Sequence, residues 1–278
     1  NNGAQRELHL SPDLWRRIEA LGQLNQATPF MTLLAAFQVL LHRYAGATDI
    51  SIGTPITNRD QPGSEDLVGF FLNTLVLRTD LSGAPSFIDL LARVRSVALG
   101  AFTHQDIPFE RIVEALAPHR NPAHTPLFQV SFVHQPKHVS PAAPGLTFEQ
   151  LDITSSTAKF DLTLFTVPGP DGLACTLEYN TDLFDAATID RMLEHFHILL
   201  EEIVAEPALP IDELPLLSAS ERQLLAGWNG GSSPYPRESS MGQLFQEVVD
   251  AHSERIAVEM GDLQISYGVL KKRMLVIA

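Results

Sequence analysis

The segment FMTLLAAFQVLLHRYAG, residues 30–46, constrains the fold more than any other part of the chain. Thr28 and Pro29 precede it as helix-start residues, and Gly46 ends it. Its apolar side chains cover most of the circumference of the predicted helix instead of forming a single stripe. We therefore expect this helix to be buried on several sides by other parts of the chain.

The size and composition of the chain limit its class. The 278 residues, of which 45% are hydrophobic, are enough for one large domain or for one domain and part of another. A formal charge of −14 disfavours contact with nucleic-acid phosphates. The single cysteine, Cys175, excludes an internal disulfide and a cysteine-rich metal cluster. The missing start methionine is a first indication of a fragment, and the chain shows neither a signal peptide nor a membrane span.

Periodicity and end signals predict a chain in which helices and strands alternate. Predicted helices cover residues 11–25, 28–46, 86–103, 108–116, 185–205 and 242–251, with one short helix between 211 and 229. Predicted strands cover residues 49–56, 67–80, 126–135, 146–153, 159–167 and 173–180, followed by a hairpin at 255–267. Residues 230–240 have the composition of a linker. This mixture indicates α/β or α+β layering.

Searches for catalytic and metal motifs give little. The sequence has no G-x-S-x-G elbow, Walker loop, G-x-G-x-x-G or H-E-x-x-H. Four histidines lie close together in the sequence. They are either ligands of a metal site or solvated loop and strand residues, and the second interpretation fits better because their spacing matches no trusted ligand pattern. These histidines are His119, His124, His134 and His138.

Two short segments leave alternatives open. His104 and Asp106 form either an acid–base pair or part of a helix-capping loop before Pro108, and capping is the favoured reading. Lys159 and Asp161 form either a solvated strand edge or a weak ion pair. The residues by themselves thus describe an α/β piece without a self-sufficient active site.

Five stretches in order resemble the condensation domain of nonribosomal peptide synthetases. They are GTPITNRDQPGSEDLVGFFLNTLVLRTDLSG, HQDIPFERIVEAL, HTPLFQVSFV, AKFDLTL and LEYNTDLFDAATIDRM. WNGGSSPYP resembles the linker that follows such a domain, and LFQEVVDAHSERIAVEMGDLQISYGVLKKR resembles the opening of an adenylation domain. The resemblance divides the chain into a condensation part at 1–217, a linker at 218–241 and an incomplete adenylation start at 242–278.

The resemblance implies a fold and an activity. Each of the family's two lobes is similar to chloramphenicol acetyltransferase, a two-layer α/β lobe with a mixed β-sheet covered by helices. Carrier proteins deliver thioesters on phosphopantetheine arms into a tunnel between the lobes, where the acceptor amine attacks the donor thioester and forms an amide. Such enzymes are transferases and ligases of secondary-metabolite biosynthesis.

The family's catalytic signature is His-His-x-x-x-Asp-Gly in the first lobe, and this sequence has no His-His pair. The matching stretches all belong to the second lobe. The resemblance therefore implies a second lobe that supplies part of the tunnel, has no catalytic residue of its own, and is inactive in isolation. An apolar face that meets the first lobe is expected to be exposed.

The resemblance also marks positions in this chain. Asn73, Thr74, Phe71 and Arg78 are candidates for the tunnel wall. Asn73 has two readings, because a buried strand amide either bridges backbone groups or hydrogen-bonds the pantetheine or thioester. Positions that match motifs with structural roles are Gly69, His104, Asp106, Pro108, Phe109, Glu110, Phe160 and Asp161.

The expected partners are donor and acceptor carrier proteins, the first lobe and a downstream adenylation domain, in the cytoplasm, without nucleic acid or membrane. No cofactor or metal is expected on the chain itself; phosphopantetheine belongs to the carriers, and ATP with Mg²⁺ to a complete adenylation domain. Two other hypotheses are a non-catalytic condensation-like scaffold that binds carrier or neighbouring domains, and an acyltransferase using coenzyme A. The adenylation-like tail argues against the latter.

Overall fold

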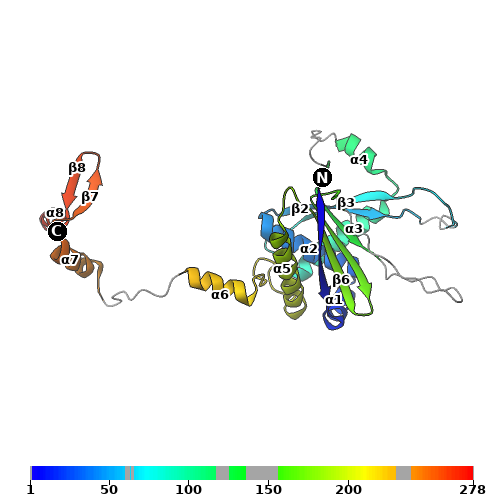
Figure 1. Ribbon diagram of the computed structural model, residues 1–278, viewed down its shortest axis with the longest axis horizontal. Helices are drawn as coiled ribbons and strands as arrows, with labels where there is room; N and C mark the ends of the chain where they lie inside the picture. Colours follow the sequence, from blue (N-terminus) through cyan, green and yellow to red (C-terminus); the bar gives the residue numbers. More distant parts are fainter. Residues whose placement is uncertain are drawn as a thin grey trace. The chain divides into compact units, whose positions relative to one another are not determined.

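A computed structural model describes residues 2–59, 63, 66–116, 125–135, 156–229 and 239–277 (Figure 1). The chain forms two compact units, Asn1–Arg222 and Gln223–Ala278. The first unit carries most of the secondary structure and nearly all of the core. The domain limits predicted from the sequence stay predictions.

The first unit contains a six-stranded mixed sheet. Neighbouring strands pair antiparallel except at β2–β4 and β4–β5, which pair parallel. Along the sheet the order is β1 (Gly3–Leu10), β6 (Gly172–Asn180), β5 (Leu162–Gly169), β4 (Val130–His134), β2 (Asp49–Ile56) and β3 (Asn73–Asp80). This confirms the predicted mixed sheet, with β1 and β3 as its edges.

Helices cover one face of this sheet. They are α1 (Pro12–Leu24), α2 (Pro29–Ala45), α3 (Phe87–Thr103) and α5 (Ala186–Ala205). Each begins after a side chain that accepts a backbone N–H, from Ser11, Thr28, Ser86 and Asp185 respectively. These predicted helices are confirmed. Two shorter helices are α4 (Phe109–Leu116), between α3 and β4, and α6 (Ala219–Trp228), after α5.

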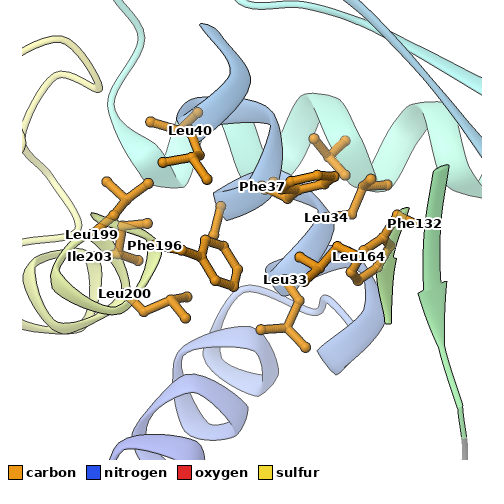
Figure 2. Packing of buried hydrophobic residues seen from close by; sticks show 14 of the residues in the cluster. Leu33, Leu34, Phe37, Leu40, Phe132, Leu164, Phe196, Leu199, Leu200 and Ile203 are labelled. Carbon is orange, nitrogen blue, oxygen red and sulfur yellow. The ribbon is translucent and has the colours of Figure 1, made fainter. Parts of the chain in front are cut away.

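Helix α2 lies at the centre of the core, as its sequence predicts. Leu33, Leu34 and Phe37 are at most 1% exposed. The Phe37 ring lies between Phe196 of α5 and Phe132 of β4, with ring centroids 6.3 and 6.2 Å away (Figure 2). The helix therefore joins the sheet layer to α1, α3 and α5.

One polar side chain interrupts this apolar helix. Gln38 is fully buried, and its Nε2 donates to Oγ1 of Thr79 in β3 at 3.0 Å. Its Oε1 has no hydrogen-bond partner among the described residues. A buried acceptor without a partner costs about 1–3 kcal/mol, so this pair lowers the stability that an all-apolar α2 would give.

The structure corrects two sequence expectations. Strand β1 was not predicted, because GAQRELHL alternates polar with weakly apolar residues and becomes a strand only through its ladder with β6. The predicted strand at 67–80 begins only at Asn73. Its partner β2 ends at Ile56, opposite Asn73, so residues 67–72 have no neighbouring strand with which to pair.

Some predictions fall outside the described residues. These are the strand at 146–153, the histidines His119, His124 and His138, and most of the linker at 230–240. His134 is described; its Nδ1 lies 2.9 Å from Thr166 Oγ1, and its ring packs against Trp15.

The second unit begins within α6 and contains α7 (Met241–His252), a hairpin of β7 (Ile256–Met260) and β8 (Leu263–Ser266), and α8 (Tyr267–Ile277). Gly261 has a φ of 58°, which confirms the Gly-Asp hairpin turn predicted from the sequence. Over the whole described part of the chain, no single helix is long and apolar enough to cross a membrane. Helices α1 and α2 reach that length and apolar composition only when taken together, and the pair is bent by 103°.

Candidate functional site

Asn73 lies at the first residue of β3, where the ladder with β2 ends. Its Nδ2 donates to the carbonyl oxygens of Gln105 and Ile107, each at 2.8 Å. Its Oδ1 accepts from the backbone N–H groups of Thr74 at 2.8 Å and Phe109 at 3.1 Å. An amide has two donor hydrogens and two acceptor lone pairs, so the protein's own backbone occupies all four.

These bonds fix the segment between α3 and α4. His104 ends α3 as its C-cap residue, and both His104 and Asp106 are exposed. The first N–H of α4, which the sequence predicted Asp106 would cap, receives its side-chain acceptor from Asn73. The segment HQDIPFE is thereby held against the sheet from β3. A ligand role for Asn73 stays a prediction.

A pocket of about 660 Å³ lies beside this segment, at the β3 edge of the sheet. Its walls come from β2, β3, the end of α3, α4 and residues 127–129, and they are mostly apolar. The lining residues are Asp49, Ser51, Leu75, Val76, Arg78, Ala101, His104, Ile107, Ile112, Leu116, Leu127, Phe128 and Gln129. Of the four residues predicted for the tunnel wall, Arg78 lines this pocket.

Arg78 forms a bidentate ion pair with Asp49 of the neighbouring strand. Its Nε lies 2.9 and 3.1 Å from the two carboxylate oxygens, and its Nη2 lies 2.6 Å from Oδ2. The hydrogen bond from Arg78 lowers the pKa of Asp49 below its ordinary value, and the pKa of Arg78 is raised. Both side chains are largely exposed, so the pair adds little stability.

Three aromatic rings contact one another in series, and the middle one, Phe128, lines the pocket. Phe109 meets Phe128 edge to face with ring centroids 5.8 Å apart, and Phe160 lies tilted against Phe128 with centroids 5.2 Å apart. The fully buried Phe128 ring lies where a side chain on Gly53 would be, so the glycine in β2 makes room for it. The backbone N–H of Asp161, just before β5, donates to the carbonyl of Gln129, just before β4, at 3.0 Å.

Residues 67–72, which we name the apolar prong, present large side chains to solvent. Val68 and Phe70 are 104% and 88% exposed, and Leu67 and Leu72 are also exposed. Arg59 binds the prong, because it donates to the carbonyl of Leu67 at 2.9 Å and its guanidinium lies 4.4 Å from the centre of the Phe71 ring. Phe71 thus points toward its own chain while Phe70 is exposed.

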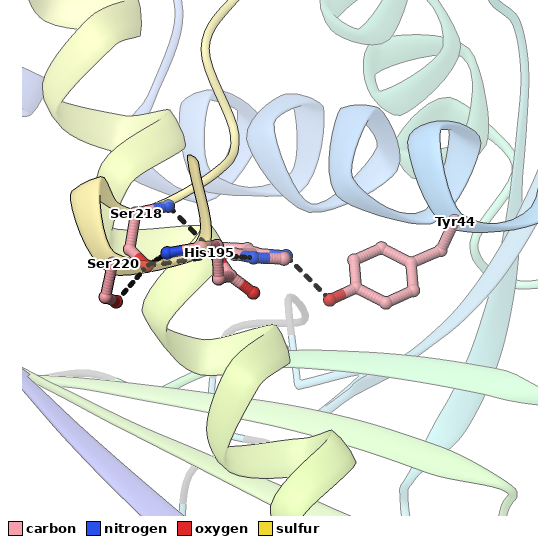
Figure 3. A network of polar contacts seen from close by, with 5 residues as sticks. Tyr44, His195, Ser218 and Ser220 are labelled. Atoms are coloured by element: carbon pink, nitrogen blue, oxygen red, sulfur yellow. Dashed lines mark hydrogen bonds and ion pairs between the residues drawn. The ribbon is translucent and has the colours of Figure 1, made fainter. Parts of the chain in front are cut away.

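A polar network that sequence reasoning missed joins α2, α5 and α6 (Figure 3). The Tyr44 hydroxyl lies 2.7 Å from Nδ1 of His195, and Nε2 of His195 lies 2.8 Å from Oε2 of Glu221. Ser218 donates to the same oxygen from its N–H at 2.9 Å and from its hydroxyl at 3.1 Å. The sequence carried one signal for it, since S-x-x-E at 218–221 has the spacing of a capping box.

Burial and bonding shift two pKa values in this network. Burial raises the pKa of Tyr44, although Arg191 acts in the opposite direction. Burial by itself would raise the pKa of Glu221, but the hydrogen bonds from His195 and Ser218 outweigh it and hold that pKa below its ordinary value. The network holds the start of α6. In the described part of the chain, no group of three or more His, Cys, Asp or Glu residues could hold a metal ion.

The fold and the sequence together match known proteins. The family model "Condensation domain" matches residues 2–226. One of the proteins that make up the linear gramicidin synthase of Brevibacillus parabrevis is 46% identical over 275 residues, which are 98% of this chain and 5% of that protein. This chain therefore spans a small part of that relative.

Solved structures give the same class. The X-domain–OxyB complex from teicoplanin biosynthesis aligns with a TM-score of 0.70 and 27% identity, covering 78% of this chain and 48% of that one. A four-domain nonribosomal peptide synthetase bound to AMP and glycine has the same fold, with a TM-score of 0.74, 22% identity, and coverage of 99% and 22%.

The helix-covered mixed sheet is thus the α/β lobe of the chloramphenicol-acetyltransferase type, which confirms the predicted fold class. The chain belongs to the condensation-domain family of nonribosomal peptide synthetases.

Proposed function

We propose that this chain is the second lobe of a condensation domain, followed by the start of an adenylation domain. In the complete synthetase the domain forms an amide between two carrier-bound thioesters. This lobe supplies one wall of the substrate tunnel, while the other lobe supplies His-His-x-x-x-Asp-Gly. In isolation the chain does not catalyse condensation.

The observation that carries this proposal is a difference in length. An alignment that covers 78% of this chain covers only 48% of a solved chain of the same fold. The sequence has no His-His pair. Half of a two-lobed domain without the catalytic signature fits the second lobe.

The apolar prong supports the presence of a first lobe. Exposed apolar side chains gathered in one segment usually mark a contact surface. Val68 and Phe70 expose far more of their side chains than core packing would allow, and Arg59 holds their backbone in place without covering them. We propose that the prong packs against the first lobe.

The pocket supports the proposal that this lobe forms part of the substrate tunnel. Its apolar walls and its polar rim at Arg78, Asp49 and His104 have the character of a site for an acyl or aminoacyl group. We propose that phosphopantetheine arms of donor and acceptor carriers reach this side of the lobe. ATP and Mg²⁺ belong to the complete adenylation domain, whose start we assign to the second unit because the 46% identical relative matches beyond the condensation-domain model.

The prong provides the test. In the complete synthetase, V68S and F70S together should reduce amide formation at least tenfold and lower the cooperativity of lobe–lobe unfolding. The matched control is L24S, because Leu24 is also exposed, at 83%, and ends α1. Equal activity in the prong variant and L24S would overturn the proposed packing. A scaffold without catalysis would show no amide formation even in the unaltered synthetase.

A further inference from the structure

Leu127 lines the pocket with its backbone in a left-handed conformation, at a φ of 72°. Glycine suits this region, whereas in other residues the Cβ atom comes too close to the following carbonyl oxygen. Among the described residues, the other non-glycine positions with a positive φ do not line the pocket; they are Gln26, Asn58 and Ala84. A bulky leucine in this conformation is a strained exception that the surrounding structure has to maintain.

The chain is anchored on both sides of Leu127. Nε2 of Gln129 donates to the carbonyl of Thr125 at 3.1 Å, which closes this segment into a loop. Next to Leu127, the ring of Phe128 is 2% exposed and occupies the space that a side chain on Gly53 of β2 would need. Leu127 thus lies inside a closed loop beside a fully packed ring, and these contacts hold a backbone that a free loop would relax.

The side chain of Leu127 is half-buried and forms part of the apolar wall of the pocket. Other apolar side chains in this wall come from regular elements, such as Val76 of β3 and Ile112 of α4. A glycine at position 127 would fit the backbone without strain, but it would leave the wall open. The loop therefore combines a strained backbone with a large side chain that narrows the pocket.

The lining also indicates what chemistry the pocket accepts. Its walls are mostly apolar, and Arg78 and Asp49 in the lining bind each other at 2.6 Å, so their charges are already paired. A charged ligand group would lose its water here without gaining a free partner of opposite charge. The pocket therefore suits an uncharged group with an apolar side chain.

We propose that Leu127 is the specificity-determining residue of this pocket. Its side chain limits the size of the apolar side chain that the pocket accepts from a carrier-bound aminoacyl or acyl group, and the anchored loop keeps it in place. The proposal rests on the proposed function of the pocket as part of the substrate tunnel, and it names the residue that selects the substrate there. Trimming Leu127 to alanine should admit larger groups, because one methylene in an apolar pocket already changes discrimination about tenfold or more.

The strain is tested by comparing glycine with alanine at the same position. At ordinary positions alanine is the more stabilising of the two, because the unfolded chain is more flexible with glycine. At Leu127 the order should reverse, so L127G should unfold at a higher urea concentration than L127A. Ile112 is the matched control, because it lines the same pocket from α4 without a positive φ, and I112A should outlast I112G. The same order at both positions would overturn the strained loop.

Probe binding to the 278-residue chain tests the selection. The probes are N-acetyl methylamides of alanine, leucine and naphthylalanine, which are uncharged and carry side chains of increasing size. L127A should raise the affinity for the naphthylalanine probe relative to the alanine probe about tenfold over the unaltered protein. The control is L183A, because Leu183 is 57% exposed and does not line the pocket. An unchanged ratio in L127A, an equal change in L183A, or no binding of any probe would overturn the proposal.

Amide formation separates this proposal from the function on which it rests. In the complete synthetase, carriers loaded with alanine, leucine or naphthylalanine would be supplied in turn as donor and as acceptor. L127A should shift the preference toward naphthylalanine about tenfold on at least one of the two sides. No amide from the unaltered synthetase, together with a shifted probe ratio, would refute the proposed function but not the role of Leu127. Amide formation with the same size preference in both proteins would refute the role of Leu127 alone.

Discussion

The side-chain oxygen of Asn73 accepts the backbone N–H of Phe109, the first residue of α4, at 3.1 Å. The same side chain donates to the carbonyls of Gln105 and Ile107. One strand residue thus positions the segment between α3 and α4, which forms one wall of the pocket.

We expect N73A to destabilise the protein. The substitution leaves the backbone groups of Gln105, Ile107 and Phe109 without their side-chain partner, which should lower the free energy of unfolding by about 1–3 kcal/mol. Urea unfolding measures this loss. Hydrogen exchange should locate the increase in opening at α4.

The N73D variant is the matched comparison. It keeps the acceptor for Phe109 but places a carboxylate oxygen against two carbonyls, so it should destabilise at least as much as N73A. In the complete synthetase, the same variants separate two roles of Asn73. Lost amide formation at an unchanged melting temperature would favour the predicted tunnel role and contradict this positioning role.

Gly53 gives a second prediction. A methyl group there would overlap the Phe128 ring, so G53A should lower the free energy of unfolding by about 1–3 kcal/mol. The control is G100A in α3, where no atom lies within 4 Å of the added carbon and the helix should gain about 0.5–1 kcal/mol. Similar unfolding curves for the two variants would show that Phe128 moves aside without cost.

The buried pair of Gln38 and Thr79 gives a third prediction. T79V removes the one acceptor of the Gln38 amide that the described residues provide, and should cost about 1–3 kcal/mol. Replacing both residues, as Q38M with T79V, also removes the unpartnered Oε1, so the double variant should be more stable than T79V. A double-mutant cycle by urea unfolding measures the coupling. Additive losses would contradict the account of this pair.

The lowered pKa of Glu221 predicts that the free energy of unfolding depends on pH. Its folded-state pKa lies below the ordinary value of about 4.3, so folding favours the ionised carboxylate. The stabilisation is fully present above that ordinary value and is lost as the pH falls through the folded-state pKa. The stability difference between the unaltered protein and E221Q should therefore shrink between about pH 6 and pH 3. A constant difference would show that Glu221 does not contribute through its charge.

The helices of the first unit could be predicted because their signals are local. Ser11, Thr28, Ser86 and Asp185 cap the helices that the sequence indicated, and the apolar circumference of α2 predicted its burial. Strand β1 could not be predicted, since its pairing depends on β6, which lies more than 160 residues away in the register Leu10 to Leu173.

The site was harder to predict than the fold. The sequence singled out Asn73 but not its four backbone bonds, because Phe109 and Gln105 approach it only after α3 has packed on the sheet. Similarly, the contact of His195 with Tyr44 and Glu221 depends on how α2, α5 and the first turn of α6 pack together. Periodicity predicts which face of an element is buried, but not which polar groups meet there.

Amide formation from donor and acceptor aminoacyl carrier proteins tests the central claim most directly. Three polypeptides would be compared: this chain, a first lobe carrying His-His-x-x-x-Asp-Gly, and the two joined in one polypeptide. The account predicts amide product from the joined polypeptide and none from either part by itself. Product from this 278-residue chain alone would contradict the assignment of a second lobe without catalytic residues.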